Sequence, residues 1–302
     1  MAIQRNGKGL VFPVEALFGG KIAPPALVKR GMADLEQRLN QRFRAGEAAR
    51  REHLAALAKV HGPLRDLLGE NEKVAAGVKQ LRALQARYAK EQLAAPAAPE
   101  AKERIFTGSI GATVVPPFSY DWSWQASSNS PDEAASSADR GTGRMSFAAW
   151  ANFDHGSSAS VRAALGIYFR PQTENGILHL TSAPALNFGW GDWCVLDGAH
   201  TDGWLGLIVG RYNLSGGLDG WSVDQQLDLW SDDSWWSGTG WQTGSTSAHP
   251  LDAWFTVDSS HWYALWVWCG GDISAAGWGI FSGSGAGSTM SVAVPSITWE
   301  LF

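Results

Sequence analysis

Cysteine and long apolar runs are both scarce in this sequence, and their scarcity excludes several classes of protein. Only Cys194 and Cys269 occur among 302 residues, too few for a disulfide framework or a four-cysteine zinc site. We expect both to be buried thiols in strands, with a single disulfide as the alternative. No stretch reaches the roughly 18 to 20 apolar residues that a membrane-spanning helix requires.

The first twenty residues lack the uninterrupted apolar core of a secretory signal. Pro13 and Glu15 divide the apolar run at residues 11–18. The sequence therefore predicts that there is no Sec signal peptide and that the protein is made in the cytosol. Export by another route, or a place in a secreted or phage-like assembly, stays open.

Lysine is absent after Lys102, and the two parts of the chain carry opposite charge. Residues 1–105 hold 19 Lys and Arg against 11 Asp and Glu, a net charge of +8, whereas residues 106–302 hold 5 Arg against 18 acids, a net charge of −13. An acidic region with so few bases repels the phosphates of nucleic acid. We therefore predict no nucleic-acid partner for it and favour a cation, a neutral sugar or a basic protein.

Strong helix formers dominate residues 26–93, where we predict a helical oligomerisation region. The apolar residues recur at steps of three and four, the spacing of one helix face, at Val28, Met32, Leu35, Leu39 and Phe43. The His-Gly-Pro run at residues 61–63 predicts a helix end, because proline lacks a backbone donor and disfavours helix in the residue before it. A further helix is predicted to end near residue 93.

These apolar stripes are narrow and rich in alanine, so the region cannot form a large core alone. We predict that it packs as a helical hairpin, as a coiled coil between chains, or both, and that it makes the protein a homo-oligomer. Acidic residues interleave with the basic ones, which argues against a membrane partner. Residues 1–25 are predicted to form an apolar arm that packs on these helices or docks to a neighbouring subunit.

A Pro/Ala linker at residues 94–104 leads to a compositionally different domain at residues 105–302. All 17 tryptophans lie in this domain, and Gly, Ser, Asn and Asp recur between short apolar runs. The pattern is typical of an antiparallel β-sandwich or jelly roll. The predicted fold is thus α+β and multidomain, with a helical hairpin or coiled coil before an all-β domain. The predicted strands are residues 106–115, 120–125, 144–153, 160–170, 176–182, 203–212, 224–230, 261–269, 278–281 and 297–302.

The segment at residues 261–269, His-Trp-Tyr-Ala-Leu-Trp-Val-Trp-Cys, is the predicted centre of this domain. Aromatic and branched residues fill both of its alternating faces, which indicates a strand. A strand that is apolar on both faces must be covered on both. We predict a second sheet on one face and a helix, another subunit or a bound ligand on the other.

Tryptophan clusters with Asp, Asn and Ser at residues 121–124, 187–193 and 230–236, which we predict to be loops. A sugar presents an apolar C–H face to aromatic rings and hydroxyls to carboxylates. These segments therefore predict a glycan site, with the alternative that each tryptophan belongs to the core of a large sandwich. The predicted stacking rings are Trp190, Trp193, Trp235 and Trp236, and the predicted hydroxyl acceptors are Asp192, Asp232 and Asp233.

No cofactor and no catalytic residue is predicted. Asp224 and Asp228 extend the acidic pair Asp232 and Asp233 and offer a calcium alternative without EF-hand spacing, although solvated turn carboxylates explain them more simply. The histidines lack metal-binding spacing, and the Ser-Gly-Ser-Gly run at residues 282–285 is predicted to be a loop. A glycosidase needs two facing carboxylates, and the sequence cannot pair any, so a glycoside hydrolase stays open.

The sequence therefore predicts a non-enzymatic, lectin-like recognition protein. Its β domain would bind a glycan or protein ligand, and the helical region would display it in several copies. The first alternative is a structural, self-assembling component of a fibre, shell or injection apparatus, held by attraction between the +8 and −13 parts of neighbouring chains. A membrane-active toxin is the third hypothesis.

Overall fold

The computed structural model describes residues 5–6, 9–10, 23–92, 97, 111–128, 133–152, 157–195, 198–234, 238, 240–276 and 283–302. The apolar part of the predicted arm, most of the predicted linker and the predicted strand at residues 278–281 lie outside these ranges. At the start of the described chain, the short strands β1 (Arg5–Asn6) and β2 (Gly9–Leu10) pair antiparallel.

The described helical region consists of α2 (Pro25–Gly69) and α3 (Glu72–Gln92). The predicted helix end at residues 61–63 is wrong, because α2 continues through Pro63. A proline inside a helix costs about 3 kcal/mol, and the strong helix formers on both sides offset that cost. Asn71 caps α3 instead, since its Oδ1 accepts the backbone N–H groups of Lys73 and Val74 at 3.1 and 3.3 Å. Neither described helix is apolar enough over a sufficient length to cross a bilayer.

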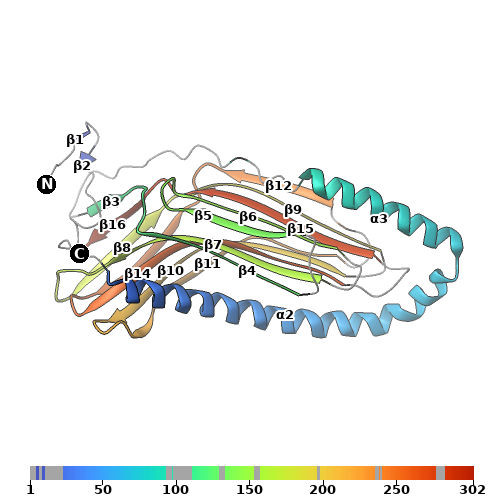
Figure 1. Cartoon of the computed structure of the whole chain (residues 1–302), viewed down its shortest axis with the longest axis horizontal. Helices are drawn as coiled ribbons and strands as arrows, with labels where there is room; N and C mark the ends of the chain where they lie inside the picture. Colours follow the sequence, from blue (N-terminus) through green and yellow to red (C-terminus); the bar gives the residue numbers. More distant parts are fainter. Residues whose placement is uncertain are drawn as a thin grey trace.

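The remaining described strands form three antiparallel sheets in two layers (Figure 1). The lower sheet has the order β11-β10-β14-β7-β4, the upper sheet β12-β9-β15-β6-β5, and the end sheet β13-β8-β16-β3. The strands are β3 (Gly111–Val114), β4 (Tyr120–Ser128), β5 (Glu133–Asp139), β6 (Arg144–Asn152), β7 (Ser157–Phe169), β8 (Gly176–Ser182), β9 (Ala185–Val195), β10 (Ala199–Asn213), β11 (Leu218–Ser234), β12 (Gly240–Thr246), β13 (Leu251–Val257), β14 (His261–Ala275), β15 (Gly283–Ala293) and β16 (Ile297–Leu301). The predicted antiparallel β-sandwich is therefore confirmed.

The order of the strands is that of a jelly roll. The pairs β8 and β9, and β12 and β13, each continue within one layer; every other connection from β6 to β15 crosses to the other layer, except the hairpin that joins β10 to β11. The lower sheet then reads β11-β10-β14-β7 and the upper sheet β12-β9-β15-β6, which interleaves strands distant in sequence. Strands β4 and β5 extend one edge of each sheet.

The end sheet continues the upper layer past a row of prolines. Strands β8 and β9, β13 and β12, and β16 and β15 follow one another in the same layer, and the breaks between them contain Pro184, Pro250 and Pro295. Proline cannot donate a ladder hydrogen bond, so it interrupts a sheet where neighbouring strands break together. The break is bridged by the N–H of His249, which donates to the carbonyl of Pro184 at 2.7 Å.

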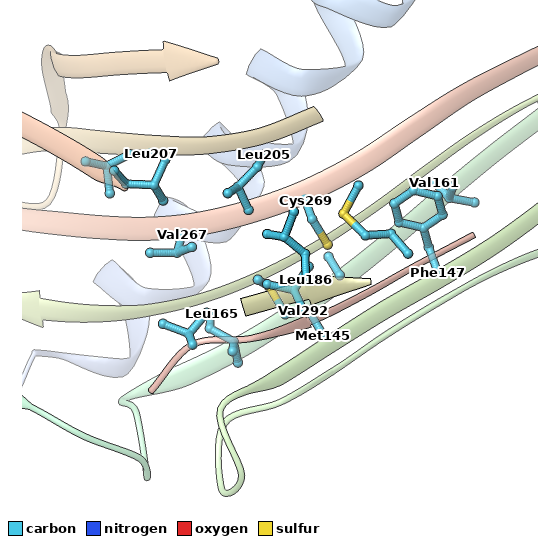
Figure 2. Close-up of a cluster of buried hydrophobic side chains, with 14 of the residues drawn as sticks. Met145, Phe147, Val161, Leu165, Leu186, Leu205, Leu207, Val267, Cys269 and Val292 are labelled. Atoms are coloured by element: carbon cyan, nitrogen blue, oxygen red, sulfur yellow. The ribbon is translucent and has the colours of Figure 1, made fainter. Parts of the chain in front are cut away.

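The main core lies between the two layers (Figure 2), and β14, the middle strand of the lower sheet, lines it. Leu265, Val267 and Cys269 of β14 are fully buried against residues of the upper layer such as Met145 and Val292. The prediction that residues 261–269 form a strand covered on both faces is confirmed. Both cysteines are buried thiols in strands, as expected, and burial raises the pKa of Cys269 to about 12.

The second face of β14 is covered by helix α2, which runs along the outer face of the lower sheet (Figure 1). Leu35 and Leu39 are almost completely buried there, against a cluster of aromatic side chains from four strands. These side chains are Tyr120, Trp122, Tyr168, Trp204, Tyr212, Trp262, Trp266 and Trp268. Burial raises the pKa values of Tyr120, Tyr168 and Tyr212 well above their ordinary range. Of the covers predicted for this face, the helix is the one observed.

Charge complementarity holds α2 on its own sandwich. Arg38 binds Asp224 Oδ2 at 2.6 Å, Arg42 forms a second ion pair with Asp224, and Arg30 donates to the carbonyl of Gly216 at 3.0 Å. The attraction between the basic and acidic parts was predicted between neighbouring chains. At these arginines it acts within one chain.

Candidate ligand-binding site

The tryptophan-rich segments at residues 121–124, 187–193 and 230–234 are parts of strands β4, β9 and β11, so their prediction as loops is wrong. The glycines of β9 allow close approach of β12: a Cβ at Gly189 would lie 2.8 Å from the indole of Trp241, and one at Gly191 would lie 2.7 Å from the backbone oxygen of Gly240. The Gly/Ser run near residue 284 was also predicted to be a loop, and from Gly283 onwards it is strand β15. A glycine needed for close ring packing has the same sequence signature as a turn glycine.

The predicted rings of β9 lie on opposite faces of the upper sheet. Trp190 points toward the interior, where its ring stacks on Phe188 at 5.7 Å and on Trp230 at 5.4 Å. Trp193 points to the other face and is buried in a cluster with Trp150 and the partly buried Trp241. These two tryptophans do not form one stacking surface.

The predicted carboxylates are built into the framework at the far end of the sandwich. Asp192 is 2% exposed and accepts a hydrogen bond from Ser234 at 2.7 Å. Asp233 Oδ1 lies 2.6 Å from His200 Nδ1. Asp232 is partly buried beside it in β11, and Trp235 and Trp236 lie outside the described residues. The structure thus brings the ends of β9 and β11 together, as the prediction required, and the described side chains that meet there are polar pairs.

His200 and Arg162 anchor a polar row across the lower sheet that the sequence analysis did not identify. His200 Nε2 lies 2.7 Å from Asp202 Oδ2, so this imidazole bridges Asp202 and Asp233. Arg162, 2% exposed, binds Asp272 Oδ1 at 2.7 Å and stacks 4.8 Å from the Trp204 ring. The alternation of polar residues on these strands was the available signal. Across the described residues, no group of three or more His, Cys, Asp or Glu side chains is arranged to hold a metal ion.

The exposed aromatic surface of the described chain lies elsewhere, on the outer face of the end sheet. Trp254 of β13 is 56% exposed, whereas every other tryptophan with a described side chain is buried or partly buried. Its indole stacks on the His179 ring of β8, with centroids 3.9 Å apart and an interplanar angle of 6°. Phe302 is 61% exposed, and its ring centroid lies 5.3 Å from that of Trp254. We call this face, formed by Trp254, His179, Phe302, Asp252 and Glu300, the end-sheet platform.

Strand register places carboxylates on both sides of the stacked rings. Asp252 Oδ2 lies 2.7 Å from His179 Nε2, and the Asp252 side chain is 55% exposed. Glu300 of β16 is the direct cross-strand partner of His179. Threonines also lie on this face, and the Oγ1 atoms of Thr113 and Thr298 are 3.1 Å apart, within hydrogen-bond distance. The platform therefore offers flat rings flanked by hydrogen-bond acceptors.

The platform was missed because nothing local to Trp254 distinguishes it from the other tryptophans. The sequence analysis did predict a strand at residues 297–302, which β16 confirms. It did not predict β13, whose sequence Leu-Asp-Ala-Trp-Phe-Thr-Val alternates exposed and buried positions. That alternation, with Asp252, Trp254 and Thr256 on one face, was a signal for the strand, but it does not show that this face is left exposed.

Comparisons with known proteins find only remote likenesses. No protein-family model and no curated protein matches the chain. Among solved structures, a family 61 carbohydrate-binding module in complex with β-1,4-galactotriose is 10% identical with a TM-score of 0.19, over 60% of this chain and 87% of that chain. The enzymatically active domain of tailspike protein 4 from bacteriophage CBA120 is 8% identical with a TM-score of 0.22, over 61% of this chain and 20% of that chain. The C-terminal family 6 module of a laminarinase from Zobellia galactanivorans is 11% identical with a TM-score of 0.17, over 63% of this chain and 98% of that chain. Likenesses this remote carry no argument about the function of this chain.

Proposed function

We propose that this chain is a non-enzymatic carbohydrate-recognition protein that binds its ligand on the end-sheet platform. The observation that carries the proposal is the exposure of Trp254 at 56%, in a chain whose other described tryptophans are buried or partly buried. Phe302 and Ile177 on the same face are 61% and 49% exposed, and an exposed apolar patch of this kind indicates a contact outside the chain.

The chemistry of the platform suits a sugar. A pyranose stacks its apolar C–H face on an aromatic ring and directs its hydroxyls to acceptors at the rim, here Asp252 and Glu300. Trp254 is held by the His179 ring at 3.9 Å, so its side chain loses little further freedom when a ligand binds. The platform is an open sheet face, which suits binding along a glycan chain rather than enclosure of a reacting bond.

A direct test is a glycan array probed with the full-length protein, with and without calcium. Trp254→Ala is expected to lower affinity for the bound glycan at least about thirtyfold, because removing a central aromatic anchor typically costs about 2 kcal/mol or more. Trp235→Ala and Trp236→Ala, at the site predicted from sequence, are the matched controls and should bind as the unmodified protein does. Near-ultraviolet circular dichroism checks the fold of each variant. Binding that survives Trp254→Ala but is lost in Trp236→Ala would move the site to the far end of the sandwich.

We further propose that the helices display several copies of the platform, through self-association of residues 26–93. Exposed apolar side chains on α2 and α3 support this: Val60 (70%), Leu64 (39%), Leu67 (67%), Leu81 (40%) and Leu84 (56%). Residues 60, 64 and 67 are spaced by four and three, as on a helix-pairing face. Multivalent display would raise the avidity of weak single sites.

Sedimentation equilibrium tests this display. The unmodified protein is expected to be an oligomer, and Val60→Glu with Leu67→Glu should give monomers whose single-site affinity is unchanged. A monomeric unmodified protein would contradict it. A particle that enlarges without limit and disperses in salt would favour the structural, self-assembling alternative instead.

A further inference from the structure

The end-sheet platform is acidic on both sides of its rings. Glu300 on β16 is the cross-strand partner of His179 on β8, whose partner on β13 is Trp254, and Asp252 lies two residues before Trp254 on β13. The described residues of this face include no lysine or arginine; beyond those already named, they are Thr113, Ile177, Thr181, Thr256 and Thr298. The surface on which a ligand would stack is thus an aromatic one with carboxylates as its fixed charges.

The surrounding domain strengthens this field. Residues 106–302 carry 18 acids against 5 arginines and no lysine. Two of those arginines are engaged within the fold: Arg162 is buried against Asp272, and Arg170 donates to the carbonyl of Ser259 at 2.8 Å. A net negative surface raises the local concentration of cations and repels anions.

We propose that the platform selects a glycan that carries protonated amino groups, such as an oligomer of glucosamine, over its N-acetylated and neutral counterparts. This inference rests on the proposed function and specifies its ligand class. An ammonium group over the face of Trp254 is attracted by the ring quadrupole. Asp252 and Glu300 then supply charge-assisted hydrogen bonds at the rim. Acidic glycans are disfavoured by the same two carboxylates.

Isothermal titration of the full-length protein tests the inference with three probes of equal length: glucosamine, N-acetylglucosamine and glucose oligomers. The experiment is run at a mildly acidic pH, at which the amine is protonated. We expect the glucosamine oligomer to bind about three- to tenfold more tightly than the other two, a ratio set by exposed cation–π and ion-pair contacts. Added salt should reduce this preference, since the groups are exposed to solvent.

The variants Asp252→Asn and Glu300→Gln separate charge from stacking. Each amide keeps a hydrogen-bond acceptor but removes the negative charge, so each variant should reduce the ratio of glucosamine affinity to N-acetylglucosamine affinity. Glu133→Gln removes the same charge from an exposed position on β5 and serves as the matched control, which should keep the full preference.

The outcomes distinguish this inference from the proposed function. Equal affinity for the amino and N-acetylated oligomers, or a preference that survives the Asp252→Asn, Glu300→Gln double variant, would overturn the selection of amino groups and leave glycan binding intact. If the folded, unmodified protein binds none of the three oligomers and no glycan on the array, the proposed function falls and the inference falls with it.

Discussion

Two aromatic surfaces of this molecule are built from similar residues, but one is buried and the other is exposed to solvent. The outer face of the lower sheet carries Trp262, Trp266 and Trp268, and α2 covers it so completely that each is 6% exposed or less. The end-sheet platform carries Trp254, His179 and Phe302, and its Trp and Phe rings are more than half exposed. The difference lies in the presence of a helix and not in the strands themselves. An aromatic strand face becomes core or binding surface according to what the rest of the chain places over it.

The largest contrast between the two surfaces should appear in stability when a tryptophan is removed from each. Trp266→Ala should lower the free energy of unfolding by about 3–5 kcal/mol, because the ring is fully buried and its removal leaves a cavity. Trp254→Ala should lower it by about 1 kcal/mol or less, since it loses mainly surface stacking. Urea unfolding measures both. A loss as large in Trp254→Ala as in Trp266→Ala would mean that the platform is structural.

A carboxylate removed from each surface should give the next contrast. Asp272→Asn leaves Arg162 buried without its charged partner, and breaking a buried pair in this way typically costs about 3–5 kcal/mol. Asp252→Asn removes a half-exposed carboxylate beside His179 and should cost about 0–1 kcal/mol. Thermal unfolding at neutral pH compares the two. Similar shifts in Tm would show that Arg162 finds other partners when Asp272 is lost.

The sequence predicted those parts of the fold that depend on local pattern. The helical stripe from Val28 to Phe43 and the doubly apolar strand at residues 261–269 were correct, because their spacing and composition require those structures. Strand β15 was missed, since Gly283, Gly285 and Gly287 resemble a loop and the rings that lie over Gly285 and Gly287 come from β9 and β6. The exposure of Trp254 and the burial of Trp193 depend on which helix or strand lies above each ring. No local pattern contains that information.

Glycine substitutions sharpen the comparison at the helix that covers the lower sheet. A Cβ at Gly31 of α2 would overlap the hydroxyl oxygen of Tyr168, which is itself fixed by donating to the carbonyl of Val28 at 3.1 Å. Gly31→Ala should therefore destabilise the protein by about 1–2 kcal/mol, although alanine favours helix. Gly77→Ala in α3 is the matched control, because its Cβ would meet no atom within 4 Å. It should stabilise by about 0.5–1 kcal/mol. Stabilisation by both would indicate that α2 is loosely seated.

The smallest expected effect concerns Asp258, in the turn that joins β13 of the platform to the central strand β14. Burial alone would raise the pKa of this carboxyl, but hydrogen bonds from Ser260 and His261 outweigh burial and lower it to about 2. A pKa below the ordinary value of 3.8 means that folding favours the carboxylate. This contribution is present in full above about pH 4 and is lost as the pH falls toward 2. Asp258→Asn should therefore lower Tm by about 2 °C at neutral pH, the shift expected for about 1 kcal/mol in a protein of this size. Between pH 4 and pH 2 the difference in Tm between variant and unmodified protein should shrink. A difference that stays constant over that range would show that the turn is held by packing around Tyr263 rather than by the charge of Asp258.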